Sequence, residues 1–122
     1  MNELKELTKA EEQIMHILWD LQGGFVKDVI DQLEEPKPAY NTISTIIRIL
    51  ETKGFLGHES FGKSHRYIPL VTKQDYKKLI TKKILHGYFD NSPKSILSFF
   101  LEENSIDVQE LNEIMTMLEK HK

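Results

Sequence analysis

Between residues 38 and 70 a helical pattern changes to a hairpin pattern, and this change limits how the chain can fold more than any other feature. Four apolar residues repeat at the spacing of one helix face: Ile43, Ile46, Ile47 and Leu50. Four polar or cationic residues occupy the opposite face: Asn41, Ser44, Thr45 and Arg48. After Gly54, two stretches rich in aromatic and β-branched residues, 55–61 and 63–68, flank a turn at Gly62. This order predicts an amphipathic helix followed by a two-stranded hairpin.

Two further helices are expected before this segment. Thr8 and Glu11 match a capping box, in which the threonine hydroxyl accepts a backbone N–H three residues later and the glutamate reaches back. The helix that begins there should end at residues 23–24, a pair of glycines, and a second helix should cover residues 26–34. The two prolines that follow prevent its continuation. Three helices followed by a hairpin predict a winged helix-turn-helix.

Residues 72–122 predict three more helices, each introduced by a cap-like residue: Thr72, Ser92 and Asp107. Their apolar side chains are hard to bury within so small a unit, which favours dimerisation. The residues expected at a dimer interface are Leu79, Ile84, Ile96, Leu97, Phe99, Phe100, Leu111, Ile114, Met115 and Leu118. We therefore expect a mainly α fold with a small β-hairpin: a winged helix-turn-helix DNA-binding domain over residues 1–71, followed by a helical dimerisation domain over residues 72–122. A monomer whose last three helices pack back on the winged helix is the alternative.

Charge is distributed unevenly along the chain, in a way that allows a nucleic-acid partner. The total of 16 Lys and Arg against 19 Asp and Glu gives a net charge of −3. However, residues 1–35 carry −6, residues 36–70 carry +3, and residues 71–122 are balanced. Because counterion release depends on the cations that meet phosphates, an acidic chain with a locally basic surface can bind DNA. A solvated basic face without a partner is the simpler alternative.

Composition excludes several other classes of protein. A length of 122 residues with 39% hydrophobic content and no cysteine indicates a small globular protein without disulfides, thiolate metal sites or a cysteine nucleophile. The N-terminus has no apolar run of signal-peptide length, and no window has the length of a membrane span. We expect a cytoplasmic protein without membrane insertion.

Motifs for catalysis and for cofactor binding are absent from the sequence. It contains no Gly-rich phosphate loop, no nucleophile elbow and no zinc-protease motif. His58 and His65 can meet across the hairpin, but two imidazoles without a pair of carboxylates are a weak metal signal. We expect neither an enzyme nor a cofactor or metal site.

Three segments together carry a family resemblance: Leu7-Thr-Lys-Ala-Glu-Glu-Gln-Ile-Met-His-Ile-Leu-Trp19, Asn41-Thr-Ile-Ser-Thr-Ile-Ile-Arg-Ile-Leu50 with Lys53-Gly-Phe, and Tyr67-Ile-Pro-Leu70. Through them the chain resembles the penicillinase-repressor family of bacterial transcription regulators, the BlaI/MecI/CopY group, over nearly its whole length. The resemblance implies a cytoplasmic homodimer on a dyad-symmetric operator of double-stranded DNA. Such repressors block antibiotic-resistance genes or, in some relatives, copper-handling genes.

The resemblance also assigns residues to DNA contacts. The family's reading helix falls on Asn41, Thr42, Ser44 and Thr45, and its wing on the turn between residues 60 and 66. We expect the reading-helix residues to meet base edges, because a recognition helix enters the major groove by its N-terminal end. The residues expected to contact phosphates are Arg48, Lys53, Lys63, Arg66 and, when protonated, His65.

Departures from the family concern operator choice and release from DNA. β-Lactam repressors of this group tend to carry basic residues where this chain has Asn41 and Ser44, so the operator sequence stays open. A membrane sensor-protease system cuts those repressors at an Asn-Phe bond, and the corresponding pair here is Phe99-Phe100. The copper-responsive branch binds metal through cysteines, which this chain lacks.

The function favoured by this resemblance is a homodimeric repressor of β-lactam resistance genes, relieved by a sensor-triggered signal. Two other functions stay open from the sequence. The winged helix can serve as a protein-interaction module that never touches DNA. The chain can also be a regulator that senses a small ligand between its domains.

Overall fold

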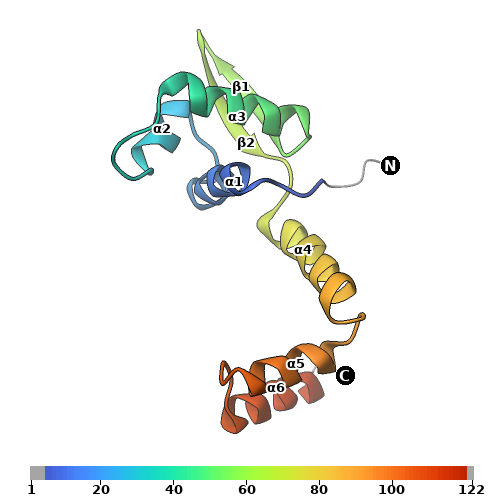
Figure 1. The fold of residues 1–122 in the computed structure, drawn as a ribbon. Helices are drawn as coiled ribbons and strands as arrows, with labels where there is room; N and C mark the ends of the chain where they lie inside the picture. The colour runs from blue at the N-terminus through green and yellow to red at the C-terminus, as the bar shows by residue number, and fades with distance from the viewer. Residues whose placement is uncertain (1–4, 121–122) are drawn as a thin grey trace. The chain divides into compact units, whose positions relative to one another are not determined.

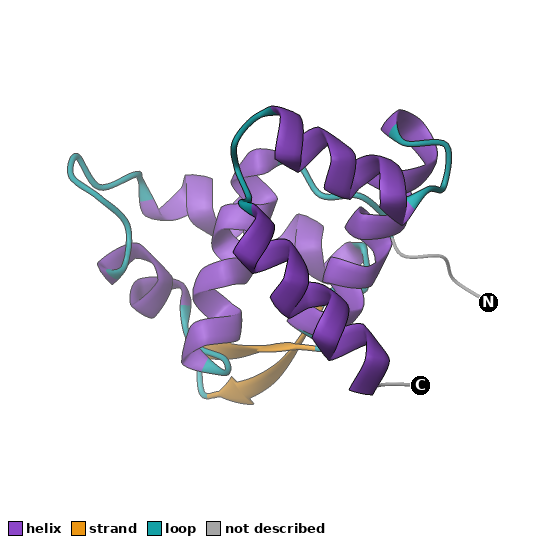
Figure 2. Cartoon of the chain, turned by 90° about the horizontal axis from the view of Figure 1, so that it is seen from below, coloured by secondary structure: helices purple, strands orange, loops and turns teal. Residues whose placement is uncertain are grey.

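The computed structural model describes residues 5–120. It shows a mainly helical chain with one small hairpin (Figure 1). The elements are, in chain order, α1 (Lys9–Leu21), α2 (Val26–Asp31), α3 (Tyr40–Thr52), β1 (Leu56–Phe61), β2 (Ser64–Pro69), α4 (Lys73–Tyr88), α5 (Pro93–Glu102) and α6 (Val108–Lys120). In Figure 2 the helices are purple and the two strands of the hairpin are orange. The predicted fold class is confirmed. The chain divides into two compact units, Met1–Leu79 and Ile80–Lys122.

The beginning of α1 is fixed by the predicted capping box. The Glu11 backbone N–H donates to the Thr8 hydroxyl oxygen at 3.2 Å, and the Thr8 N–H donates to the Glu11 carboxylate at 2.9 Å. Two donors that a helix N-terminus leaves unpaired are thereby satisfied. The helix ends where Gln22 adopts a left-handed conformation with φ of 59°.

The second helix is shorter than expected. It ends at Asp31, whereas the apolar spacing predicted an end at residue 34. The next two N–H groups bond three residues back, Gln32 to Val29 at 3.1 Å and Leu33 to Ile30 at 3.0 Å, which is the tighter geometry of a closing turn. Leu33 is nevertheless buried, so the periodicity identified a core residue outside the helix.

The core of the first unit lies between the three N-terminal helices and the base of the hairpin. Its fully buried large side chains are Phe55, Ile14, Met15, Leu18, Ile47, Leu50, Leu56 and Val29. They come from α1, α2, α3, β1 and the residue just before β1, so each element contributes an apolar face. Such interlocked packing positions the opposite face of α3 toward solvent.

The hairpin is tied to the turn between α1 and α2 as well as to itself. In the antiparallel pair Leu56 faces Pro69 and Phe61 faces Ser64. Gly24 and Tyr67 exchange both backbone hydrogen bonds, at 2.9 and 2.8 Å. A Cβ on the preceding residue, Gly23, would lie 3.0 Å from the Tyr67 carbonyl oxygen, and its φ is +114°. Glycine there permits the close approach that holds the hairpin against the helices.

The first unit ends within α4, at Leu79. The sequence placed the domain boundary between residues 71 and 72, which is eight residues earlier. Tyr76 is buried, and its ring packs edge-to-face against Phe55 with 5.6 Å between centroids. Its hydroxyl accepts the Leu7 backbone N–H at 2.8 Å. These contacts join the first turn of α4 to the winged helix.

The second unit leaves most of its apolar side chains at least partly exposed. Among its described residues only Ile106 is buried. Of the residues expected at a dimer interface, Leu79, Ile96, Leu97, Leu111 and Ile114 are half-buried, whereas Ile84, Phe99, Phe100 and Met115 are exposed. The side chain of the tenth, Leu118, lies outside what the structure describes. Within residues 5–120, none of the helices has the length and apolar character needed to cross a membrane.

Candidate nucleic-acid interface

The outward face of α3 carries a stripe of short polar side chains and one arginine. Burial of Ile43, Ile47 and Leu50 fixes the inward side of the helix. The side chains that remain exposed opposite to it are Asn41, Thr45, Arg48 and Thr52. Thr52, near the end of the helix, was not among the residues predicted from the sequence.

Hydrogen bonds to the helix backbone hold parts of this stripe in place. The Thr45 hydroxyl donates to the Asn41 carbonyl oxygen at 2.8 Å, and the Thr52 hydroxyl donates to that of Arg48 at 3.0 Å. Arg48 Nε makes a longer contact of 3.5 Å with the Ser44 carbonyl oxygen. The first turn of α3 contains no acidic residue that would repel a phosphate. The face is therefore suited to a polyanion.

An open groove of about 710 Å³ lies between α3, the hairpin and the start of α2. Its lining residues are Phe25, Val26, Lys27, Asp28, Tyr40, Ser44, Arg48, Phe61, Lys63, Ser64, His65 and Tyr67. Figure 1 shows the tip of the hairpin near the N-terminal half of α3, and Tyr40 and Ser44 from that half line the groove. Residues from three separate parts of the chain thus converge on one concave surface.

Positive charge prevails in this groove. Lys27, Arg48 and Lys63 contribute three cations, against the single carboxylate of Asp28. That carboxylate accepts the Phe25 backbone N–H at 2.9 Å and so caps α2. Burial, with a smaller effect of the Glu51 carboxylate, raises the pKa of Tyr67, so its phenol stays neutral at physiological pH.

Thr42 and Ser44 lie on opposite sides of the outward stripe. Ser44 lines the groove beside the hairpin. Thr42 lines a separate hollow of about 310 Å³, which it shares with Ile14, Leu33 and Ile46. The structure therefore places the two residues at the two edges of the face that carries Asn41 and Thr45.

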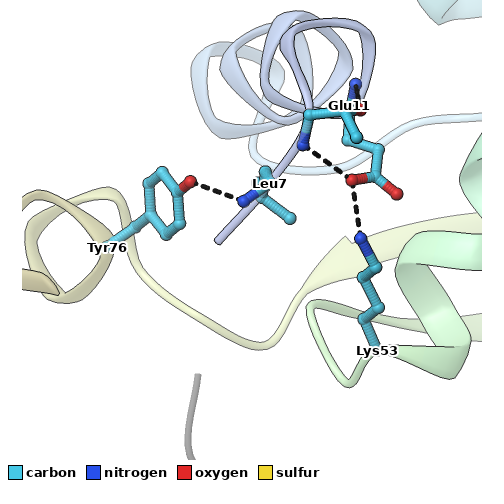
Figure 3. A network of polar contacts seen from close by, with 5 residues as sticks. Leu7, Glu11, Lys53 and Tyr76 are labelled. Carbon is cyan, nitrogen blue, oxygen red and sulfur yellow. Dashed lines mark hydrogen bonds and ion pairs between the residues drawn. The ribbon is translucent and has the colours of Figure 1, made fainter. Parts of the chain in front are cut away.

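Two of the cations expected to contact phosphates have partners inside the protein. Lys53 Nζ lies 2.7 Å from Glu11 Oε1, with 23% of the lysine side chain and 7% of the glutamate side chain exposed (Figure 3). Burial alone would raise the pKa of Glu11, but the hydrogen bonds from Lys53 and Thr8 together hold it below the ordinary value. Arg66 Nη2 donates to the Gln22 carbonyl oxygen at 3.2 Å. Neither residue lines the groove.

The expected meeting of His58 and His65 is confirmed. Their ring centroids lie 4.4 Å apart in an edge-to-face arrangement, and the His58 ring also bonds the Glu51 carboxylate. Over residues 5–120 the structure has no group of three or more His, Cys, Asp or Glu side chains placed to hold a metal ion. His65 lines the groove, whereas His58 does not.

Eight of the residues that line the groove were not among the site residues predicted from the sequence: Phe25, Val26, Lys27, Asp28, Tyr40, Phe61, Ser64 and Tyr67. Lys27 is far along the chain from α3, and no local pattern links the two. Tyr40 gave the only sequence signal of a site residue, because it is an aromatic residue at the first position of an amphipathic helix, away from the apolar face. In the structure it is 58% exposed.

Residues 7–120 match the model of one protein family, described as penicillinase repressor. The chain is 27% identical over 123 residues to the penicillinase repressor of Bacillus licheniformis, covering 100% of this chain and 96% of that protein. It is 26% identical over 120 residues to the methicillin resistance regulatory protein MecI of Staphylococcus aureus, covering 98% of each.

Two solution structures are similar to part of the chain. One is the DNA binding domain of the repressor BlaI, with a TM-score of 0.53. The other is the monomeric form of Bacillus licheniformis BlaI in complex with the blaP half-operator, with a TM-score of 0.51. Each is 27% identical and covers 62% of this chain and 94% of the other.

Proposed function

Because the chain belongs to the penicillinase repressor family, whose model matches residues 7–120, we propose that it is a homodimeric repressor of β-lactam resistance genes acting at a dyad-symmetric operator. The family consists of DNA-binding transcriptional repressors and not of enzymes, and the chain is a DNA-binding repressor of this kind. The homodimer, the operator symmetry, the regulated genes and the individual contacts make up the proposal.

The observation that carries the proposal is the polar outward stripe of α3 beside a cationic groove. The N-terminal half of α3 enters the major groove, where Asn41 and Thr45 face base edges and Thr42 and Ser44 lie at the two margins. Arg48 and Lys63 hold the phosphates of the strand that passes between α3 and the hairpin, and His65 joins them when protonated.

Lys53 and Arg66 take structural roles in this proposal. The ammonium group of Lys53 neutralises a buried carboxylate, and the guanidinium of Arg66 fastens the hairpin to the end of α1. Moving Lys53 toward a phosphate would leave the Glu11 carboxylate without its counter-charge, and moving Arg66 would break its hydrogen bond to the Gln22 carbonyl oxygen, so each movement costs free energy.

A second copy of the chain is the proposed partner of the C-terminal unit. Its exposed apolar side chains include Phe99, at 46% exposed, and Met115, at 51%. The Phe99 ring also contacts the rings of Phe89 and Phe100, with 5.8 and 6.2 Å between centroids. Exposed apolar side chains that lie together mark association sites. A two-fold dimer places its two reading helices about 34–36 Å, or a multiple of that spacing, apart along DNA, which accounts for a dyad operator.

Relief of repression is proposed to come from a signal passed by a membrane sensor to this cytoplasmic repressor. If the signal is proteolytic cleavage at Phe99-Phe100, the protease meets a bond in the middle of α5 (Pro93–Glu102). A helical peptide bond is cleaved only after local opening. Cleavage therefore requires α5 to unwind first, and limited digestion with sequencing of the fragments tests this point.

Selection of genomic DNA fragments by the purified protein tests the function. We expect an enriched motif with two-fold symmetry, next to genes for β-lactam resistance. Enrichment of an asymmetric motif would contradict the dimeric mode, and the absence of enrichment would contradict operator binding altogether.

The oligomeric state is tested separately by light scattering on the eluting protein. Phe99→Glu should convert the dimer to a monomer, because it places a charge in the proposed apolar contact. Lys94→Glu, at an exposed polar position of the same helix, is the matched control. A Phe99→Glu protein that elutes with the mass of the wild type would contradict this interface.

A further inference from the structure

Tyr40 is an exposed aromatic side chain at the entrance of the groove that the proposed contacts leave without a role. It is the first residue of α3 and is 58% exposed. It lines the groove with Ser44 and Arg48, which follow at intervals of four residues on the same side of the helix. Its neighbours across the groove include Lys63 and His65 of the hairpin.

The position of Tyr40 around α3 separates it from the residues that face base edges. With 3.6 residues per turn, Tyr40 is offset from Asn41 by about 100° and from Thr45 by about 140°. When the outward stripe points into the major groove, Tyr40 therefore faces the side where Lys27, Arg48 and Lys63 gather. That side meets the sugar–phosphate backbone and not the bases.

We propose that the Tyr40 hydroxyl donates a hydrogen bond to a phosphate of the DNA strand that lies in this groove; the inference rests on the proposed function. A phenol hydroxyl is an uncharged hydrogen-bond donor. Helical side chains lean toward the helix N-terminus, so the Tyr40 ring reaches ahead of α3. The three cations of the groove attract the phosphate, and Tyr40 fixes its position.

A neutral donor has a signature that a cation lacks. An arginine or lysine that meets a phosphate releases a counterion, so its loss reduces the dependence of affinity on salt. A phenol releases none, so its loss weakens binding equally at every salt concentration. Because phosphates carry no sequence information, the weakening is also the same on any duplex.

Fluorescence anisotropy with the selected operator and with an unrelated duplex, each at several salt concentrations, tests the inference. Tyr40→Phe removes only the hydroxyl and keeps the ring. We expect about three- to tenfold weaker binding on both duplexes, with the salt slope of the wild type. Tyr88→Phe removes a hydroxyl from a residue that is 83% exposed in the second unit, and should bind like the wild type.

Several results would overturn the inference while leaving the proposed function intact. Wild-type affinity of Tyr40→Phe would exclude the hydrogen bond. If Tyr40→Phe weakens binding to the operator alone, Tyr40 reads a base. If the salt slope becomes flatter, the substitution has displaced a neighbouring cation from its phosphate. If the wild type binds neither duplex, the proposed function itself is wrong. Unchanged Trp19 fluorescence and circular dichroism of the variant establish that it is folded.

Discussion

Replacement of Lys53 by methionine tests whether this lysine stabilises the winged helix or contacts DNA. Its Nζ lies 2.7 Å from Glu11 Oε1, and only 7% of the glutamate side chain is exposed. Methionine keeps most of the aliphatic chain and removes the charge. The Glu11 carboxylate then retains its bond from the Thr8 backbone N–H but loses its counter-charge.

The expected loss lies between those of surface and buried ion pairs. Exposed pairs contribute about 0–1 kcal/mol, whereas breaking a fully buried pair costs about 3–5 kcal/mol. Because Lys53 is 23% exposed and Glu11 keeps a second partner, we expect the free energy of unfolding to fall by about 2 kcal/mol. For a domain of about 60–100 residues this lowers Tm by about 10 °C.

Urea unfolding followed by Trp19 fluorescence measures this loss. Trp19 is the only tryptophan, and its indole N–H donates to the Val71 carbonyl oxygen at 2.8 Å, so its signal reports on the first unit. Lys63→Met is the matched control, since Lys63 is exposed and lines the groove. We expect opposite outcomes: Lys53→Met loses stability and keeps DNA affinity, whereas Lys63→Met keeps stability and loses affinity. A Lys53→Met protein within about 0.5 kcal/mol of the wild type, with weakened DNA binding, would refute this reasoning.

The remaining predictions concern DNA contacts, pH and the anchoring of α4. Arg48→Ala should weaken binding to every duplex and flatten the salt slope by about one unit, whereas Thr45→Ala should cost about 1–3 kcal/mol mainly at the operator; titrations at two salt concentrations measure both. Since the pKa of Glu11 in the folded state lies below its ordinary value of 4.5, the unfolded chain binds that proton more readily. The stability that Glu11 contributes should thus be complete above about pH 4.5 and disappear as pH falls through the folded-state pKa, so wild-type urea midpoints should fall more steeply than those of Glu11→Gln. Tyr76→Phe leaves the buried Leu7 N–H without its 2.8 Å acceptor and should lower the free energy of unfolding by about 1–3 kcal/mol, as thermal melts would show.

Local signals in the sequence predicted most of the element order. The capping residues Thr8 and Ser92 start helices where expected, and Gly62, with φ of 63°, forms the hairpin turn. These features depend on neighbours within a few residues, which is the range that periodicity and capping describe. The end of α2 was missed because a closing turn can bury Leu33 at a helix-like spacing.

The candidate site was only partly predictable, because its composition depends on pairings between distant residues. Sequence spacing identified the outward stripe of α3, since that stripe follows from a single helix. It did not indicate that Lys53 pairs with Glu11, 42 positions earlier, or that Arg66 reaches Gln22, 44 positions earlier. The same limit hid Lys27 and Tyr40, which share a surface only after the hairpin has folded against α2 and α3.

The paired backbones of Gly24 and Tyr67 have a consequence for induction. The hairpin is bonded to the turn that leads into α2, and α2 packs on α3, so backbone hydrogen bonds and core packing join the wing to the reading helix. A signal that moved the hairpin away from α3 would have to break this backbone pairing and disturb the core beneath it. For the proposed dimer, we therefore expect that release from DNA leaves each winged helix unchanged and separates the two DNA-binding units, which together bind DNA more tightly than either alone.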